Sequence, residues 1–450
     1  MSNKADLTNV NQETERKLKP KLRFRDFRDA EEWSNEKLKS LYSFKATNSY
    51  SRDKLNYENG LVKNIHYGDI HTKFSALFNI ENEIVPFINP SESLEKISID
   101  SYCVEGDIIF ADASEDLDGV GKSIEIVHLN NEKLLSGLHT LLARQRDNRF
   151  VVGFGGHLFK SSWMRTQIKR ESQGAKVLGI SATRLSNIDV VFPSNKKEQQ
   201  KIADCLSSID DRITAENQKL DTLKAHKKGL MQQLFPVEGK TLPKLRFIEF
   251  RNASEWEVKR IEDLSVRGSG HTPNKSQPSY YNGGIKWVSL ADSNKLDNGY
   301  IYETKVEISK EGLKNSSAVL HPVGTVIISR DAGVGKSAVL YSEMAVSQHF
   351  IAWRCDESKL SNWFLYYFLQ VLKPKFEAIA TGSTIKTIGL PYFKEICITI
   401  PSVLEQKKIA DCLISIDELV AAQTQKIEAL KLHKKGLMQQ LFPSINEVSG

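Results

Sequence analysis

Several features that mark membrane proteins, secreted proteins and metalloproteins are scarce or missing in this sequence. It has no run of 18 apolar residues and no apolar signal region at its N-terminus. Its five cysteines are scattered and form no CxxC pair, which argues for a reducing cytosol and against a disulfide framework or a zinc site. We therefore expect a soluble, cytoplasmic protein with no membrane partner and no bound metal.

Recognisable catalytic patterns are missing too, because no paired carboxylates and no Ser/His/Asp arrangement rise above chance. The segments Gly-Val-Gly-Lys-Ser at 119–123 and 333–337 invite a nucleotide-binding interpretation, but the Walker pattern needs a glycine five residues before the second glycine. Asp116 and Arg330 occupy those places. Two interpretations remain for these segments: a structural glycine turn, or a phosphate contact through Lys122 or Lys336.

The composition that is present suits two or three domains with proper cores. The 450 residues are too many for one ordinary domain, and 40% of them are hydrophobic. The net charge is +6, from 62 basic and 56 acidic residues. This mild basic excess permits a nucleic-acid partner without requiring one.

Two stretches of the chain are copies of each other. Residues 198–236 and 405–443 align without a gap, and 27 of the 39 positions are identical. Apolar residues in each copy follow a 4-3-4-3 spacing, which is the seam of a coiled coil. One helix cannot bury such a seam alone, so we expect the two helices to pair, each as a rod of about 50 Å. The residues expected at the helix–helix and partner interface are Ile202, Leu206, Ile209, Ile213, Leu220, Leu223, Leu230, Leu234, Ile409, Leu413, Ile416, Val420, Ile427, Leu430, Leu437 and Leu441.

Polar residues interrupt each seam at two equivalent places, Glu216 and Lys227 in the first copy and Gln423 and Lys434 in the second. Single polar positions in a coiled coil fix the register of the helices, and we expect that role here.

The starts of both helices carry a capping signal. Ser402 and Glu405 have the spacing of a capping box, and Asn195 and Glu198 have the same spacing. Each pair predicts a helix N-terminus directly before the coiled-coil seam.

A second block shows that the duplication extends beyond the helices. Residues 20–33 return at 243–256 with 10 of 14 positions identical. Between the repeats, strand-like segments such as 124–129, 188–192, 285–290 and 396–400 alternate with helix-like ones such as 363–372, so we expect a mixed α/β (α+β) globule in each half.

The fold expected from these repeats is two globules in tandem, separated and joined by two long antiparallel coiled-coil helices with pseudo-two-fold symmetry. The expected segments are a polar tail at 1–19, a globule at 20–192, a helix at 193–236, a linker at 237–242, a globule at 243–400, a helix at 401–443 and a tail at 444–450.

These landmarks, in this order and duplicated, resemble the specificity subunit of type I restriction–modification systems. The resemblance rests on the Pro-Lys-Leu-Arg-Phe openings, the passage from Ile398-Thr399-Ile400-Pro401 into Glu405-Gln406, and the closing His-Lys-Lys-Gly-Leu-Met-Gln-Gln-Leu-Phe-Pro. Thr381-Gly382-Ser383-Thr384 looks like the glycine-serine loop that such domains use near DNA. The first globule departs from that loop, with Ser172-Gln173-Gly174-Ala175 in its place.

The resemblance implies two target recognition domains, each reading one half of a split site in double-stranded DNA. It also implies that the helices set the spacer and dock two methyltransferase (modification) subunits, with restriction subunits in the full complex. This chain would have no catalytic residues and no cofactor, because S-adenosylmethionine, ATP and Mg belong to the partner subunits. Half-sites one DNA turn apart, roughly 34–36 Å, are compatible with the expected rod.

Basic, amide and hydroxyl side chains of both globules are candidates for DNA contacts, because Lys and Arg bind phosphates and Gln pairs with adenine. A solvated helix face, a plain surface loop and an internally satisfied polar pair are the competing interpretations. The candidates are Lys122, Lys160, Arg165, Lys169, Arg170, Lys176, Lys336, Gln348, His349, Thr381, Gly382, Ser383, Thr384 and Lys386.

Two other functions compete with DNA recognition. A coiled-coil scaffold that recruits proteins would explain the helices but not two diverged globules. A nucleic-acid enzyme acting alone would need a catalytic set of residues. The apolar helix ends, Leu234-Phe235 and Leu441-Phe442, are expected either to pack on their own globule or to dock a partner.

Overall fold

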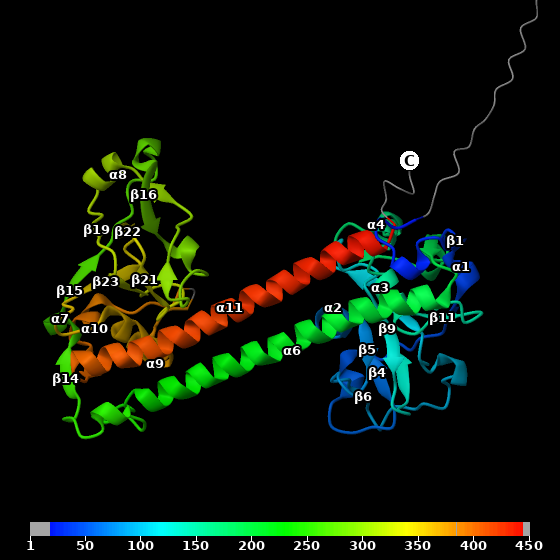
Figure 1. Cartoon of the computed structure of the whole chain (residues 1–450), viewed down its shortest axis with the longest axis horizontal. Coiled ribbons are helices and arrows are strands. Elements are labelled where there is room, and N and C mark those ends of the chain that lie inside the picture. Colours follow the sequence, from blue (N-terminus) through cyan, green and yellow to red (C-terminus); the bar gives the residue numbers. More distant parts are fainter. Residues whose placement is uncertain (1–18, 384, 444–450) are drawn as a thin grey trace, which may run out of the picture. The chain divides into compact units, whose positions relative to one another are not determined.

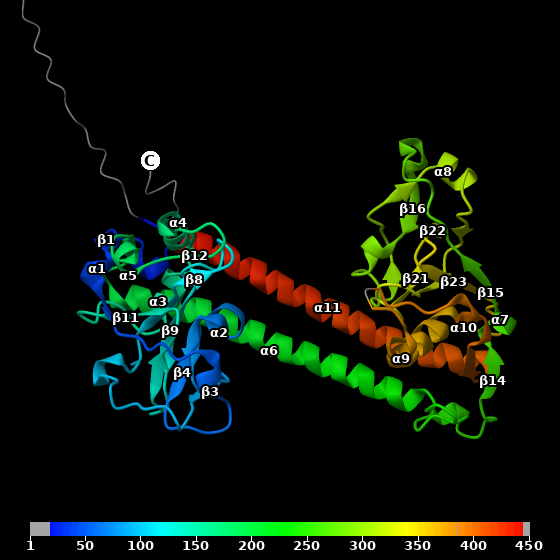
Figure 2. The same ribbon diagram turned by 180° about the vertical axis from the view of Figure 1, so that it is seen from behind.

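The computed structural model describes residues 19–383 and 385–443, which form two compact units. Within the described residues, unit 1 comprises 19–215 and 427–443, and unit 2 comprises 216–426. Each unit therefore contains one globule together with parts of both long helices, α6 (Lys196–Leu234) and α11 (Val403–Leu441). Figures 1 and 2 show the two helices side by side.

The globule of unit 1 contains a five-stranded sheet in the order β2-β11-β7-β9-β5 and a four-stranded sheet in the order β10-β4-β6-β3. Its strands are β1 (Ser34–Lys37), β2 (Tyr42–Lys45), β3 (Leu55–Asn56), β4 (Lys63–Ile65), β5 (Leu77–Asn79), β6 (Phe87–Ile88), β7 (Ile108–Ala111), β8 (Ala113–Ser114), β9 (Ser123–His128), β10 (Leu134–Ser136), β11 (Thr140–Gln145), β12 (Leu178–Gly179) and β13 (Asp189–Phe192). Its helices are α1 (Leu38–Leu41), α2 (Tyr67–Thr72), α3 (Phe154–Leu158), α4 (Ser162–Glu171) and α5 (Ala182–Leu185).

The globule of unit 2 repeats this plan, with sheets in the orders β15-β23-β20-β21-β17 and β18-β16-β22-β19. Its strands are β14 (Glu257–Arg260), β15 (Ser265–Ser269), β16 (Tyr281–Val288), β17 (Tyr300–Ile301), β18 (Glu307–Ile308), β19 (Leu320–His321), β20 (Val326–Ser329), β21 (Ser337–Leu340), β22 (Met344–Val346), β23 (Phe350–Cys355) and β24 (Cys397–Ile400). Its helices are α7 (Ile261–Leu264), α8 (Lys310–Lys314), α9 (Asn362–Ile379) and α10 (Leu390–Glu395).

The central strand of each larger sheet is buried on both faces. In β7, Ile108 and Phe110 belong to the hydrophobic cluster that includes the start of α6, whereas Ile109 belongs to the cluster on the other face. In β20, Val326 and Ile328 face one cluster and Ile327 faces the other. Alternate residues of a strand point to opposite faces, so an uninterrupted apolar run is what a strand between two cores requires. The predicted fold class, a mixed α/β globule in each half with an antiparallel pair of long helices, is confirmed.

The helix pair is antiparallel, and its polar seam residues are all used. In unit 2 Lys227 forms an ion pair with Asp417, and in unit 1 Lys434 forms the equivalent pair with Asp210. Gln423 donates from Nε2 to the backbone oxygen of Glu216 at 2.8 Å and to its carboxylate at 2.7 Å. All sixteen predicted seam residues are buried or half-buried.

The helix starts differ from the predicted capping boxes. The Glu405 amide does donate to Ser402 Oγ at 3.4 Å, but the Glu405 carboxylate binds Arg246 Nε and Nη2, each at 2.7 Å. Arg23 binds Glu198 in the same way and with the same distances. An arginine outcompetes the cap because it offers two parallel charge-assisted hydrogen bonds. The arginine of each Pro-Lys-Leu-Arg-Phe opening therefore fastens that opening to a helix start.

The apolar helix ends pack in neither of the predicted ways. Leu234 and Phe235, at the end of the first repeat, are buried in the core of unit 2, with the Phe235 ring 5.2 Å from Phe364. Leu441 and Phe442 are buried in the core of unit 1. The antiparallel pairing brings the end of each helix to the globule of the other repeat, so these residues lie neither on their own globule nor on a free docking surface.

Candidate nucleic-acid interface

Three loops of unit 1 meet where β7 ends. The Asp112 amide donates to the His139 carbonyl at 3.0 Å, and the Ile180 amide donates to the Asp112 carbonyl at 2.8 Å. These bonds join the end of β7 to the turn before β11 and to the loop after α4. We call residues 112, 137–139 and 172–180 loop cluster 1.

The same three loops meet in unit 2. The Arg330 amide donates to the His349 carbonyl at 2.9 Å, and the Ile388 amide donates to the Arg330 carbonyl at 3.0 Å. We call residues 330–331, 347–349 and 381–388 loop cluster 2; Thr384, predicted to contact DNA, lies outside the described residues. The matching bonds identify equivalent positions, so Asp112 corresponds to Arg330 and His139 corresponds to His349.

Each loop cluster holds a histidine against a carboxylate. His139 Nδ1 lies 3.2 Å from Asp112 Oδ1, and His349 Nδ1 lies 2.8 Å from Asp331 Oδ2. The two histidine side chains remain 51% and 32% exposed. A carboxylate on Nδ1 fixes the orientation of an imidazole and directs its Nε2 edge away from the bond. Each unit therefore presents one oriented imidazole to solvent.

A glycine in the left-handed region shapes the third loop of each cluster. Gly174 has φ 133° and Gly382 has φ 120°. A Cβ at these positions would lie 1.9 Å from the Val177 oxygen and 2.2 Å from the Ile385 oxygen, so only glycine fits. The loop of the first globule therefore keeps the geometry of the second despite its different sequence. Of the predicted DNA-contact residues here, Thr381, Gly382, Ser383 and Lys386 are exposed.

The lysines of the two Gly-Val-Gly-Lys-Ser segments are turned inward. Lys122 donates from Nζ to the His71 carbonyl at 2.7 Å, and Lys336 donates to the Ser293 carbonyl at 3.1 Å. Desolvation lowers the pKa of Lys122. The structural glycine turn accounts for both segments, because each lysine fastens the turn to the neighbouring short helix.

The basic residues predicted near the end of the first globule do not form one patch. Arg165 donates to the carbonyls of Asp118, Val120 and Gly121, and so clamps the glycine turn. Lys169 pairs with Asp118. Both side chains therefore serve the fold of unit 1.

The other predicted basic residues differ in their surroundings. Lys160 touches solvent, yet desolvation by the surrounding protein and the nearby Lys434 on the helix pair lower its pKa to about 8. Arg170 and Lys176 flank the Gly174 loop and are exposed. Among the described residues no hydrogen-bond or ion-pair partner engages the side chains of Arg170, Lys176 and Lys386, which leaves these three charges available for a ligand.

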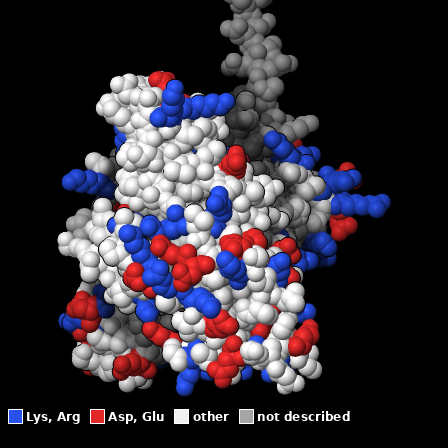
Figure 3. Space-filling model, turned by 90° about the vertical axis from the view of Figure 1, so that its left-hand side faces the viewer, with Lys and Arg blue, Asp and Glu red and all other residues white. Residues whose placement is uncertain are grey.

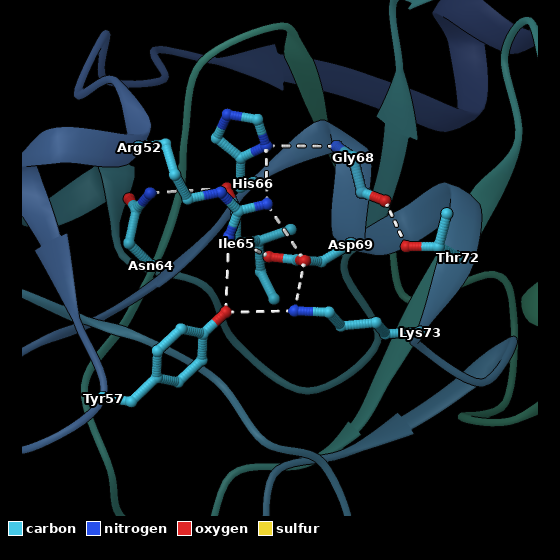
Figure 4. A network of polar contacts seen from close by, with 9 residues as sticks. All are labelled: Arg52, Tyr57, Asn64, Ile65, His66, Gly68, Asp69, Thr72 and Lys73. Atoms are coloured by element: carbon cyan, nitrogen blue, oxygen red, sulfur yellow. Dashed lines mark hydrogen bonds and ion pairs between the residues drawn. The ribbon is translucent and has the colours of Figure 1, made fainter. Parts of the chain in front are cut away.

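Sequence reasoning missed a polar network beside loop cluster 1. Arg52 binds Asp69 through Nη1 at 2.8 Å and Nη2 at 3.1 Å, and Lys73 reaches the same carboxylate at 3.0 Å and the Tyr57 hydroxyl at 3.1 Å (Figure 4). Asp69 is 1% exposed, and although burial raises its pKa, the bonds from Arg52 and Lys73 hold that pKa below its usual value. Arg52 and Lys73 are both nearly half exposed.

This network is continuous with loop cluster 1. Gly68 donates to His66 Nδ1 at 3.1 Å, and the Tyr67 ring lies 4.7 Å from the His66 ring and 5.3 Å from the His139 ring. The surface therefore combines two half-exposed cations with the half-buried Tyr67 ring and the exposed His139 imidazole, which suits phosphate and base contacts. No sequence signal marks it, because Arg52 lies in a stretch without periodicity.

The counterpart in unit 2 is built from different side chains. Asp292 is buried like Asp69 and pairs with Lys295 at 3.2 Å, but Ser289 replaces His66 at the helix N-cap, and among the described residues no arginine binds Asp292. Instead, a groove of about 540 Å³ opens beside Ser289, and Gln348 and His349 line it. The surroundings of the two loop clusters have thus diverged while their backbone connections have not.

Charges of both signs intermix on the side of the molecule drawn in Figure 3, so no broad basic field covers that side. Within residues 19–383 and 385–443, no helix is long and apolar enough to cross a membrane. The same residues contain no group of three or more His, Cys, Asp or Glu side chains that could hold a metal ion.

Comparison with known proteins places the chain in a family. The family model "Type I restriction modification DNA specificity domain" matches residues 31–225 and 253–432, so the chain belongs to this family, with the domain present twice. The chain is 26% identical over 358 residues to the putative type I restriction enzyme MjaX specificity subunit of Methanocaldococcus jannaschii, covering 78% of this chain and 81% of that protein. It is 25% identical over 345 residues to the MjaVIII specificity subunit of the same organism, covering 72% and 76%.

A solved structure has the same fold. The type I restriction–modification S subunit from M. genitalium superposes with a TM-score of 0.57 at 14% sequence identity, covering 95% of this chain and 100% of that one.

Proposed function

We propose that this chain is the sequence-specific DNA recognition subunit of a type I restriction–modification complex, in which each unit reads one half of a split DNA site. One observation carries the proposal: the two loop clusters share their backbone bonds, oriented histidine and left-handed glycine, but differ in the exposed side chains around them. Recognition of two different half-sites requires a similar backbone arrangement in both units with different side chains exposed on it.

The contacts with the DNA backbone fall to exposed cations, which either lack a partner among the described residues or keep an exposed face beside Asp69. In unit 1 these are Arg170, Lys176 and the exposed faces of Arg52 and Lys73; in unit 2 it is Lys386. Phosphate contacts set the position of a protein on the duplex, and base contacts select the sequence.

The chain acts without catalysis of its own in this proposal. Two modification subunits dock on it through the outer faces of α6 and α11, and restriction subunits join the full complex. S-adenosylmethionine, ATP and Mg are held by those partners. The complex works in the cytoplasm, where chromosomal and incoming DNA are found.

Selection from a random duplex library tests the proposal. The full-length chain, with modification subunits added, should enrich one split consensus with a fixed spacer. Purified chain incubated alone with DNA and S-adenosylmethionine should transfer no methyl groups. A library that shows no enrichment would favour a protein scaffold, and methyl transfer by the chain alone would overturn the non-catalytic role.

A further inference from the structure

The two loop clusters differ at the residue directly before the oriented histidine. The Asn48 amide donates to Ser136, and the His271 amide donates equivalently to Val346, each at 3.1 Å. Counting from these bonds, Leu138 precedes His139 in unit 1 where Gln348 precedes His349 in unit 2. The same place in the frame therefore carries an apolar side chain in one unit and an amide in the other.

The amide of Gln348 is oriented by a chain of hydrogen bonds. The Asp331 carboxylate can only accept, so in the neutral form of His349 the proton lies on Nδ1 and Nε2 is an acceptor. Gln348 Nε2, 3.5 Å from that nitrogen, donates to it, and Gln348 Oε1 accepts from the Thr272 hydroxyl. The acceptor nitrogen of His349 selects the amide orientation, and the Thr272 hydroxyl, which can donate or accept, then donates to Oε1.

These bonds leave a defined pattern on the free edge of the amide. One N–H of Nε2 and one lone pair of Oε1 remain without a partner among the described residues, on a side chain that is exposed to solvent. Adenine presents the complementary pair in the major groove, an acceptor at N7 and a donor at N6. Guanine presents two acceptors there and cannot satisfy both groups.

The surroundings of Gln348 suit a base edge. It lines the groove beside Ser289 together with Thr272, His349 and the mostly buried Trp287. The Trp287 ring is fixed by a bond from its Nε1 to the His271 carbonyl at 3.1 Å. A rigid wall next to an oriented amide limits the positions that a base can take.

Unit 1 has the same frame without the amide. Its histidine is held by Asp112, and the position equivalent to Thr272 is Ser49, also a hydroxyl. Leu138 is half-buried and offers no hydrogen bond. Unit 1 therefore keeps the carboxylate-held histidine and a hydroxyl but has no amide beside them, and strand pairing places Asn64 where unit 2 has Trp287.

We propose that Gln348 reads an adenine in the half-site of unit 2 and that Thr272 and His349 are its positioning residues. At the equivalent place in unit 1, Leu138 cannot form these hydrogen bonds and so does not select adenine. The inference rests on the proposed function, since it assigns one residue of that DNA interface to one class of base.

Half-site selection with matched variants tests the inference. The wild-type chain should require an adenine at one position of one half-site, with a loss of roughly 5- to 140-fold in affinity when that base is changed. Gln348→Leu should abolish the preference at that position alone. Gln277→Leu, which removes an exposed glutamine elsewhere in unit 2, should change nothing.

Two further variants separate reading from folding. Thr272→Val should weaken the adenine preference and Thr272→Ser should keep it, because the hydroxyl of Thr272, and not its methyl group, bonds the amide. Leu138→Gln should create an adenine preference in the other half-site. Continued selection of the remaining positions in both half-sites shows that each variant is folded.

The outcomes distinguish this inference from the proposed function. A split consensus that Gln348→Leu leaves unchanged, or changes in both halves, overturns the role of Gln348 and leaves the DNA specificity function standing. A wild-type chain with no split consensus overturns the proposed function itself, and the inference with it.

Discussion

The end of each long helix is buried in the globule of the other repeat, an arrangement that we call crossed packing. It predicts that a substitution in one repeat destabilises the unit that contains the globule of the other repeat. Phe235 belongs to the first repeat but is 2% exposed in the core of unit 2, with its ring 5.2 Å from Phe364 and 5.8 Å from Phe368. Truncating a buried phenylalanine to alanine costs about 3–5 kcal/mol. Phe235→Ala should therefore destabilise unit 2 and leave unit 1 unchanged.

Hydrogen exchange measures this effect unit by unit, which a single unfolding transition of a two-unit chain would not. The slowest amides of β20 and β23 should exchange roughly 100- to 4,000-fold faster in Phe235→Ala, and those of β7 and β11 should keep their rates. Phe442→Ala is the matched variant and should give the opposite pattern. Faster exchange in β7 for Phe235→Ala would refute the crossed packing.

Three other predictions concern the buried charges and the helices. Arg246→Leu leaves the buried Glu405 carboxylate without its partner and should destabilise unit 2 by about 3–5 kcal/mol, whereas adding Glu405→Leu should recover part of that loss; hydrogen exchange of the slowest amides of β20 and β23 measures both. Burial raises the pKa of Glu125 to about 7, so the folded state holds this proton more tightly than the unfolded state. The resulting stabilisation of unit 1 is complete below pH 4.5 and is lost as the pH rises through 7. Hydrogen-exchange protection of β7 and β11, corrected for the intrinsic pH dependence of exchange, should show this decline, and Glu125→Gln should remove it. A heptad inserted after Ala215 and another after Ala422 lengthen both helices by about 10 Å, and the spacer between the half-sites should grow by about 3 base pairs. An unchanged spacer in library selection would show that the helices do not set its length.

The sequence predicts the parts of the fold that follow from local periodicity. The predicted strands at 124–129, 188–192, 285–290 and 396–400 overlap β9, β13, β16 and β24, and the predicted helix at 363–372 lies within α9. The long helices are predicted to within three residues at each end. Period-2 and heptad patterns suffice for these elements because each depends on neighbours along the chain.

The candidate site is less accessible to such reasoning because its contacts join distant residues. Glu198 has the spacing of a capping residue, but an arginine 175 positions away takes its carboxylate. Lys122 and Arg165 look like free charges in the sequence, and backbone carbonyls far along the chain use them. That Leu138 and Gln348 occupy equivalent positions is seen only when the hydrogen bonds of the two globules are compared.

The uneven identity between the two repeats follows from where the repeated segments meet. In unit 1 the opening segment lies against the end of α11, where the Leu22 amide donates to the Gln440 carbonyl at 2.9 Å; in unit 2 the Leu245 amide makes the same bond to Gln233. Each junction is completed by the start of a helix, through the bidentate arginine–glutamate pair. In each junction the opening segment comes from one repeat and the helix end from the other. A substitution in one repeat must therefore remain compatible with the packing surface that the other repeat supplies. The loop clusters carry no such constraint, since every residue in a cluster comes from one globule, and there the chemistry of the two halves is free to differ.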